Sequence, residues 1–311
     1  MMKMLDEIRH IRLREIALTT GIMLLPLVPI TGPSSYDGLV TQARAADMPK
    51  LNTSRLVSIG GDVTEIVYAL GEEKRLIARD STSTYPDAAA KLPDVGYMRA
   101  LSPEGILAVN PTAIIAVDGS GPPEALAVLR NASVPFETVP QSFGRDGILT
   151  KITTVGALLG VPDKAKVLED KVAADLDAAI AASSKRPEAE RKRVLFILSA
   201  QGGRIMASGT GTAADGIIKL AGAVNAVGVF PGYKPLTDEA IIEAKPDVIL
   251  IMNGGGDHTI SNDDLLKQPA LSLTPAADHK AIIRMDGLHL LGFGPRTASA
   301  VRELNTAIYG G

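Results

Sequence analysis

The chain has 311 residues, of which 46% are hydrophobic and 22% are charged, and its formal net charge is −3. With roughly 150 residues per domain as a loose guide, this length indicates about two domains with enough apolar residues to form a core. The small net charge argues against nucleic acid as a partner. Because the sequence contains no Cys, it excludes disulfide scaffolds, thiolate zinc sites, iron–sulfur clusters and thiol catalysis, and it leaves oxygen, imidazole or thioether groups as metal ligands.

The first 45 residues have the pattern of a secretory signal. Basic residues within positions 1–14 precede the uncharged apolar stretch 16–30, which is shorter than the roughly 20 apolar residues of a membrane span. Ala43-Arg44-Ala45 fits the small-x-small rule for cleavage, so we expect a signal peptide at residues 1–45 and a periplasmic product that is not embedded in a membrane. A disordered tail or an uncleaved anchor is the alternative. Since no Cys follows the apolar stretch, we expect no lipid anchor.

From residue 55 onward, strand-like runs alternate with helix-like stretches. Asp62-Val63-Thr64-Glu65 has the D-x-x-E form of a helix capping box and predicts a helix that ends near Gly71. Short runs rich in β-branched residues predict strands at 55–59, 75–78, 113–117 and 135–139. This alternation predicts an α/β lobe with a mostly parallel sheet.

The second half of the chain repeats this plan. It has a predicted helix at 215–221 and predicted strands at 194–199, 204–207 and 248–252. The segment 101–107, followed by Pro111, parallels the segment 236–242, followed by Pro246, at a constant offset of 135 residues. The match indicates two lobes of similar plan, although a helix followed by Pro and a strand is a common unit and chance similarity is an alternative.

The stretch between the two halves has the strongest helical pattern. Pro162 suits a first helical turn, and residues 163–184 carry apolar residues at four-residue spacing, namely Leu168, Val172, Leu176 and Ile180. About 22 residues at 1.5 Å each form a rod of roughly 33 Å. We therefore predict two Rossmann-like α/β lobes, 46–160 and 187–311, joined by one long rigid helix, 161–186, with a ligand cleft between them.

Tyr97 is the most informative single side chain. It precedes a helix that Ser102 can cap, and loops at the carboxyl ends of parallel strands line the ligand crevice of α/β proteins. A phenolate is an anionic oxygen ligand suited to Fe(III), and Tyr is one of the proximal ligands of haem iron. Because free Tyr titrates at about 10, ligation at neutral pH needs help, which the positive charge of Arg99 can supply. From the residues alone, a half-buried loop aromatic is the alternative.

Four segments together resemble the periplasmic haem-binding proteins of bacterial ABC haem importers, which belong to the helix-linked (class III) substrate-binding proteins: 57–71, 96–104, 209–215 and 292–296. The resemblance implies that the protein captures haem b (hemin) for iron acquisition and delivers it to an importer permease with its ATPase. It implies that Tyr97 is the axial iron ligand, with Arg99 beside it. We expect a monomer that catalyses no reaction. A cobalamin or ferric-siderophore carrier of the same fold is the alternative.

The sequence does not identify which side chain of the second lobe binds the haem iron. Some members of the resembling family contribute a His from that lobe, but the loop after Ser199 contains none. Met206 offers a thioether, although a single Met beside a strand is more often part of a core. His258 lies in a glycine-rich loop after a predicted strand and is a weaker candidate.

Glu104 and Glu239 occupy equivalent places in the internal match, each two residues after a Ser or Thr that can cap its helix. Acidic residues in a first helical turn complement the helix dipole, which is a sufficient reason for their presence. In the resembling class, however, one Glu per lobe docks the carrier onto its permease. We therefore expect these two residues to form partner contacts.

Residues 209–214 also fit the G-x-G-x-x-A pattern of dinucleotide-binding enzymes. The rest of that fingerprint fails, because no Asp or Glu occurs between Asp215 and Asp238 to bind a ribose. Neither G-x-S-x-G nor H-E-x-x-H occurs in the chain. A binding protein is thus favoured over an enzyme.

Overall fold

The computed structural model of the chain describes residues 51–253 and 260–310. The predicted signal peptide, residues 1–45, lies outside the described residues. Within the described part, none of the helices combines the length and the apolar character needed to cross a membrane.

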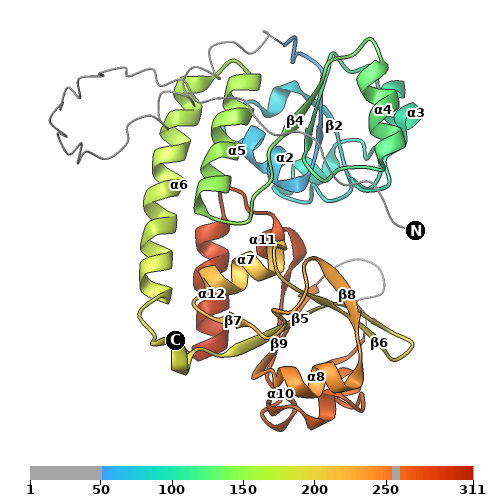
Figure 1. Cartoon of the computed structure of the whole chain (residues 1–311). Coiled ribbons are helices and arrows are strands. Elements are labelled where there is room, and N and C mark those ends of the chain that lie inside the picture. The colour runs from blue at the N-terminus through green and yellow to red at the C-terminus, as the bar shows by residue number, and fades with distance from the viewer. Residues whose placement is uncertain (1–50, 254–259, 311) are drawn as a thin grey trace, which may run out of the picture. The chain divides into compact units, whose positions relative to one another are not determined.

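The first lobe is built on a four-stranded parallel sheet in the order β2-β1-β3-β4 (Figure 1). Its strands match the predicted runs to within a residue: β1 (Leu56–Ile59), β2 (Leu76–Arg79), β3 (Ala113–Val117) and β4 (Phe136–Val139). The helices are α2 (Gly61–Ala69), α3 (Pro103–Ala108), α4 (Pro123–Asn131) and α5 (Arg145–Leu158), with 3-10 turns η1 (Glu73–Arg75) and η2 (Ala89–Lys91). Alternate residues of β1 and β3 pack against α2 and α5 on one face and against α3 and α4 on the other.

The second lobe contains a six-stranded mixed sheet, in which β10, β9, β5 and β7 pair in parallel. Strand β6 pairs antiparallel with β5, and the edge strand β8 pairs antiparallel with β6. The strands are β5 (Arg193–Gln201), β6 (Arg204–Ser208), β7 (Val224–Asn225), β8 (Tyr233–Leu236), β9 (Val248–Asn253) and β10 (Ile282–Asp286). The helices are α7 (Ala213–Leu220), α8 (Asp238–Ala244), α9 (Asn262–Leu266), α10 (Pro275–Asp278), α11 (Gly287–Leu291) and α12 (Thr297–Tyr309), with η3 (Glu188–Glu190) and η4 (Leu271–Leu273). The predicted two-lobe α/β architecture is confirmed, although the sequence did not reveal β7, β8 or β10.

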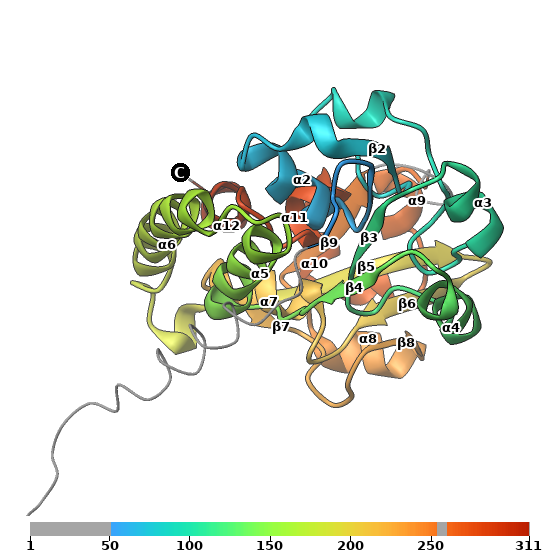
Figure 2. The same cartoon turned by 90° about the horizontal axis from the view of Figure 1, so that it is seen from above.

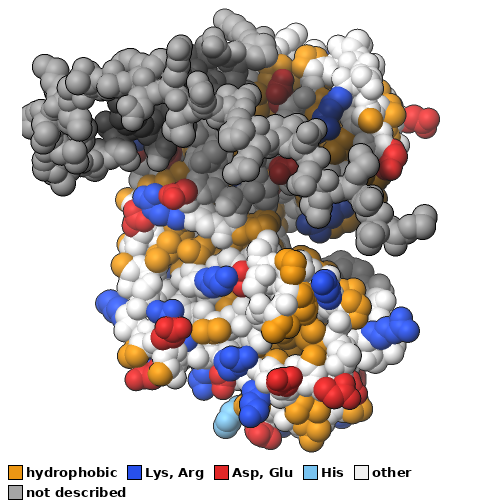
Figure 3. Space-filling view, in the orientation of Figure 1, with side chains coloured by type: hydrophobic (Ala, Val, Ile, Leu, Met, Phe, Trp, Pro, Cys, Tyr) orange, Lys and Arg blue, Asp and Glu red, His pale blue; other side chains and the backbone are white. Residues whose placement is uncertain are grey.

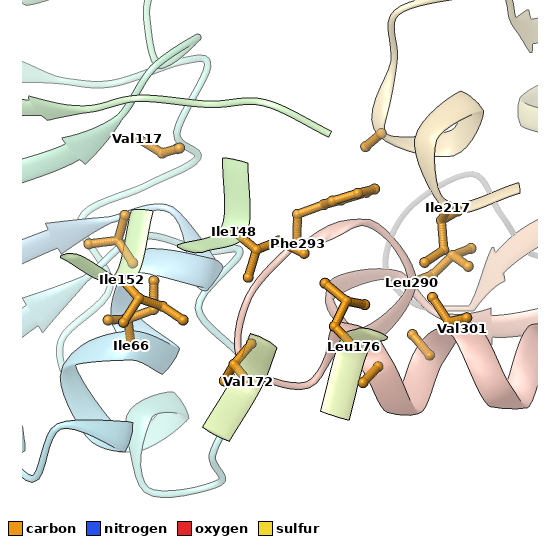
Figure 4. Packing of buried hydrophobic residues seen from close by; sticks show 14 of the residues in the cluster. Ile66, Val117, Ile148, Ile152, Val172, Leu176, Ile217, Leu290, Phe293 and Val301 are labelled. Atoms are coloured by element: carbon orange, nitrogen blue, oxygen red, sulfur yellow. The ribbon is translucent and has the colours of Figure 1, made fainter. Parts of the chain in front are cut away.

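The long helix α6 (Pro162–Ser183) joins the lobes and packs along α5 and α12, as Figures 1 and 2 show. The predicted apolar stripe is its packed face, since Val172 and Leu176 are buried and Leu168 and Ile180 are half-buried against the core. One hydrophobic cluster runs from α2 and α5 past α6 to Phe293 and α12 (Figure 4). The lobes therefore share a continuous core, and relative motion between them must preserve it.

The internal match has a structural basis. In the first lobe the parallel order is β2-β1-β3-β4, and in the second the corresponding order is β7-β5-β9-β10, with β6 and β8 added. Helices α3 and α8 precede the equivalent strands β3 and β9, which begin 135 residues apart. The hydroxyl oxygens of Ser102 and Thr237 accept hydrogen bonds from the backbone N–H groups of Gly105 and Ala240, so both helices begin with the predicted cap.

The predicted capping box at 62–65 is wrong. Helix α2 starts after Gly60 without a side-chain cap, because both acidic residues bind partners far away in the sequence. Asp62 pairs with Lys151 of α5, and both side chains are buried. Glu65 pairs with Arg296 of the second lobe at 2.9 Å. Burial raises the pKa of Glu65, while the hydrogen bond and charge of Arg296 act in the opposite direction.

Candidate functional site

Tyr97 lies on the loop between β2 and α3, beyond the carboxyl end of a parallel strand. One carboxylate secures the start of this loop. Asp94 accepts hydrogen bonds from the backbone N–H of Gly96 at 2.8 Å and from Ser81 Oγ at 3.0 Å, and it pairs with Arg79 Nη1 at 2.6 Å. Charge-assisted bonds of this kind hold a loop in one conformation.

The tip of the loop is tied to its neighbours through the backbone. Ser81 N–H donates to Gly96 O at 2.9 Å, and Gly121 N–H, from the loop after β3, donates to Met98 O at 2.9 Å. Gly96 has a φ of +100°, a conformation that L side chains rarely adopt. Met98 is half-buried and packs on the core, so the loop turns this side chain inward and leaves its two neighbours outside.

Tyr97 is 45% exposed, and Arg99 is also exposed. The Nη1 atom of Arg99 lies 3.5 Å from the phenol oxygen of Tyr97. The structure therefore brings these two predicted site residues together as an accessible phenol oxygen beside a positive charge.

Tyr233 of β8 is a residue that the sequence analysis missed. Its side chain is half-buried, and burial raises the pKa of its phenol. The hydroxyl of Thr212, the charge of Arg99 and the backbone N–H of Ala214 lower this pKa, and Tyr97 raises it slightly. Tyr233 thus lies within electrostatic reach of the Tyr97 loop on the other lobe. In the space-filling view, Lys or Arg side chains lie on both sides of the hollow between the lobes (Figure 3).

Among the contacts of the described residues, none brings Met206 to this loop. Met206 is half-buried in β6, where it pairs with Ser199 on one side and Pro235 on the other. His258 lies outside the described residues. Within 51–253 and 260–310, no three His, Asp or Glu side chains are grouped as a metal site would require.

The G-x-G-x-x-A turn between β6 and α7 is closed by its own side chains. Thr212 caps α7 by accepting a hydrogen bond from Asp215 N–H at 3.0 Å. Asp215 accepts from Gly211 N–H at 3.0 Å and pairs with Lys219 at 2.7 Å. Two N–H groups of the kind that would hold a phosphate in a dinucleotide site are thus bound within the turn, that of Gly211 to a carboxylate and that of Asp215 to a hydroxyl.

Glu104 and Glu239 are exposed in the first turns of α3 and α8, one on each lobe. Hydrogen bonds from its own backbone N–H and from Thr237 lower the pKa of Glu239, so this carboxyl is ionised at neutral pH. The two residues are not in contact with each other; they hold the same position on two similar lobes.

The chain matches the family model of periplasmic binding proteins over residues 56–287. It is similar to the periplasmic haem-binding protein BhuT in complex with two haems, with 40% identity, a TM-score of 0.77 and coverage of 82% of this chain and 97% of BhuT. It is similar to apo RhuT from Roseiflexus sp. RS-1, with 39% identity, a TM-score of 0.78 and coverage of 82% and 98%. A vitamin B12-binding protein of Pectobacterium atrosepticum is 26% identical over 81% of this chain and 90% of that protein.

Two α/β lobes joined by one long helix define the helix-linked class of substrate-binding proteins, and the chain belongs to the periplasmic binding protein family. Within that family it groups with the haem-binding members, because its identity to BhuT and RhuT is well above its identity to the vitamin B12-binding protein.

Proposed function

We propose that this protein captures haem as Fe(III) protoporphyrin between its two lobes and delivers it to an ABC importer. The observation that carries the proposal is the exposed phenol of Tyr97, held on a fixed loop with the Arg99 guanidinium 3.5 Å away. A phenolate is a hard anionic ligand for Fe(III), and a neighbouring cation favours the ionised form of a phenol. The similarity to BhuT and RhuT, both named as haem-binding proteins, supports the same ligand.

The proposed role is that of a carrier rather than an enzyme. The proposed carrier has an export signal at residues 1–45, two lobes at 46–160 and 187–311 joined by the segment 161–186, and one ligand-binding cleft. The protein acts as a periplasmic monomer, binds no nucleic acid and catalyses no reaction. Glu104 and Glu239 dock the two lobes on the permease, and lobe separation there releases haem. Met206 and His258 are secondary candidates for contact with the ligand.

The assignment of Tyr97 is tested by titrating the protein with hemin and recording the visible spectrum, then repeating the titration with Tyr97→Phe. We expect the wild-type protein to show a phenolate-to-iron charge-transfer band. In the variant this band should disappear and the affinity should fall by at least about tenfold, as expected when a metal ligand is removed. Tyr68→Phe, on helix α2, is the matched control and should leave both unchanged.

An unchanged band and affinity in Tyr97→Phe would reject Tyr97 as the iron ligand. Titration with cyanocobalamin in parallel distinguishes a haem carrier from a cobalamin carrier, which is the alternative suggested by the vitamin B12-binding relative. Tighter binding of cobalamin than of hemin by the wild-type protein would reject the haem assignment as a whole.

A further inference from the structure

The second lobe repeats the Gly-Tyr pair of the first. Gly96-Tyr97 lies ahead of Leu101-Ser102, and Gly232-Tyr233 lies ahead of Leu236-Thr237, with one residue fewer between the pair and the helix cap. Both glycines adopt positive φ, +100° for Gly96 and +76° for Gly232. A Gly-Tyr pair therefore stands shortly before the capped helix of each lobe, on the loop before α3 in the first lobe and at the start of β8 before α8 in the second.

Tyr233 is held firmly on one side. Its strand pairs with β6, where Tyr233 is the partner of Ser208, and Gly209 N–H donates to Gly232 O at 2.8 Å. Its ring packs edge-to-face on Phe196, with the centroids 6.4 Å apart, and Phe196 is completely buried. Because the Tyr233 side chain is only half-buried, part of it remains accessible.

Tyr233 also interacts electrostatically with the first lobe. The positive charge of Arg99 lowers the pKa of its phenol, and the phenol of Tyr97 raises it. Because burial has the largest effect and raises its pKa, the phenol is protonated at neutral pH and has an O–H to donate. A protonated phenol close to a guanidinium is suited to an anionic group such as a carboxylate.

We propose that Tyr233 is a second-lobe binding residue that donates a hydrogen bond to a carboxylate oxygen of the bound haem, next to the positive charge of Arg99. The inference rests on the proposed function and extends it. The first lobe then holds the iron through Tyr97, and the second lobe recognises the acidic edge of the porphyrin through the equivalent tyrosine. Both lobes therefore contact the bound haem.

The test combines a protein change with a ligand change. Tyr233→Phe removes only the hydroxyl, and hemin dimethyl ester removes the carboxylate charge. We expect Tyr233→Phe to bind hemin at least about tenfold more weakly than the wild-type protein, as for a lost hydrogen bond to a charged group. With the dimethyl ester the two proteins should have equal affinities. The charge-transfer band of the Tyr97 complex should be unchanged in Tyr233→Phe.

Three results would overturn the inference. Equal affinity of Tyr233→Phe and the wild-type protein for hemin would show that the hydroxyl makes no contact. An equal loss of affinity for hemin and for its ester would show that the carboxylate is not the partner. A changed charge-transfer band would make Tyr233 an iron ligand instead. Tyr68→Phe serves as the control for each ligand, and the thermal unfolding midpoint confirms that Tyr233→Phe is folded. If the wild-type protein binds no hemin at all, the proposed function fails first, and this inference with it.

Discussion

At the scale of single residues, the position of Tyr97 depends on its neighbour. Gly96 has a φ of +100°, and a Cβ added there would meet nothing within 4 Å. The space around Gly96 is open, so a side chain would be disfavoured by backbone strain alone. The preceding carboxylate of Asp94 accepts the Gly96 N–H and keeps that conformation in place. The accessible phenol is thus the consequence of a local backbone geometry.

We predict that Gly96→Ala lowers the free energy of unfolding by about 1 to 2 kcal/mol, because it puts an L residue in the left-handed region. It should weaken hemin binding as well, since the loop relieves the strain by moving Tyr97. Gly160→Ala is the matched control: Gly160 has a φ of +70° with equally open space, and it lies at the end of α5. The control should lose similar stability in chemical denaturation but keep its hemin affinity. Equal affinities in both variants would show that the Gly96 conformation does not position the phenol.

At the scale of elements, helix α2 depends on charges supplied by distant segments. The Nζ atom of Lys151 is completely buried, pairs with Asp62 and lies 3.2 Å from Phe293 O. This one side chain connects α2, α5 and the segment that leads into α12. A buried charge without its partner carries a large desolvation penalty, which makes the pair more sensitive to single than to double substitution.

We therefore predict that Lys151→Met destabilises the protein by about 3 to 5 kcal/mol, because it leaves the Asp62 carboxylate buried and unpaired. Combining it with Asp62→Asn should recover at least half of that loss. Lys171→Met, at an exposed position on α6, is the control and should leave the denaturation midpoint unchanged. If the double variant is as unstable as the sum of the two single variants, the penalty does not come from the unpaired charge.

At the scale of the whole molecule, the two lobes are similar units that share one core. The cluster around α5, α6 and α12 continues through Phe293, and the Glu65–Arg296 pair adds a polar contact between the lobes. Arg296 also lies over the ring of Tyr85, 3.5 Å from its centroid. These contacts make wide opening of the lobes costly, so a partner that separates them must hold each lobe separately. Glu104 and Glu239 are exposed carboxylates, one on each lobe, and the proposed docking role assigns them to this contact.

We predict that Glu104→Ala combined with Glu239→Ala lowers hemin transport by at least about tenfold in vesicles that contain the importer, since desolvated charge pairs at an interface contribute strongly to binding. The affinity for hemin in solution should not change, because both residues are exposed and neither is among the residues proposed to contact haem. Glu124→Ala combined with Glu243→Ala removes two other exposed glutamates and is the control. Equal transport by the double variant and the wild-type protein would refute the docking role.

Local sequence determined much of this fold. Alternating strand-like and helix-like runs predicted β1 to β6 and β9, and the four-residue spacing of apolar residues predicted the packed face of α6. Ser102 and Thr237 marked the starts of α3 and α8. These signals could be recognised because each depends on residues close together in the chain. The tertiary structure alone decided which distant groups meet. It paired Asp62 with Lys151 and Glu65 with Arg296 instead of forming a capping box, since a buried carboxylate is destabilising unless a cation pairs with it. It also brought Tyr233, on a Pro-containing edge strand with weak local signals, within electrostatic reach of Arg99 and Tyr97.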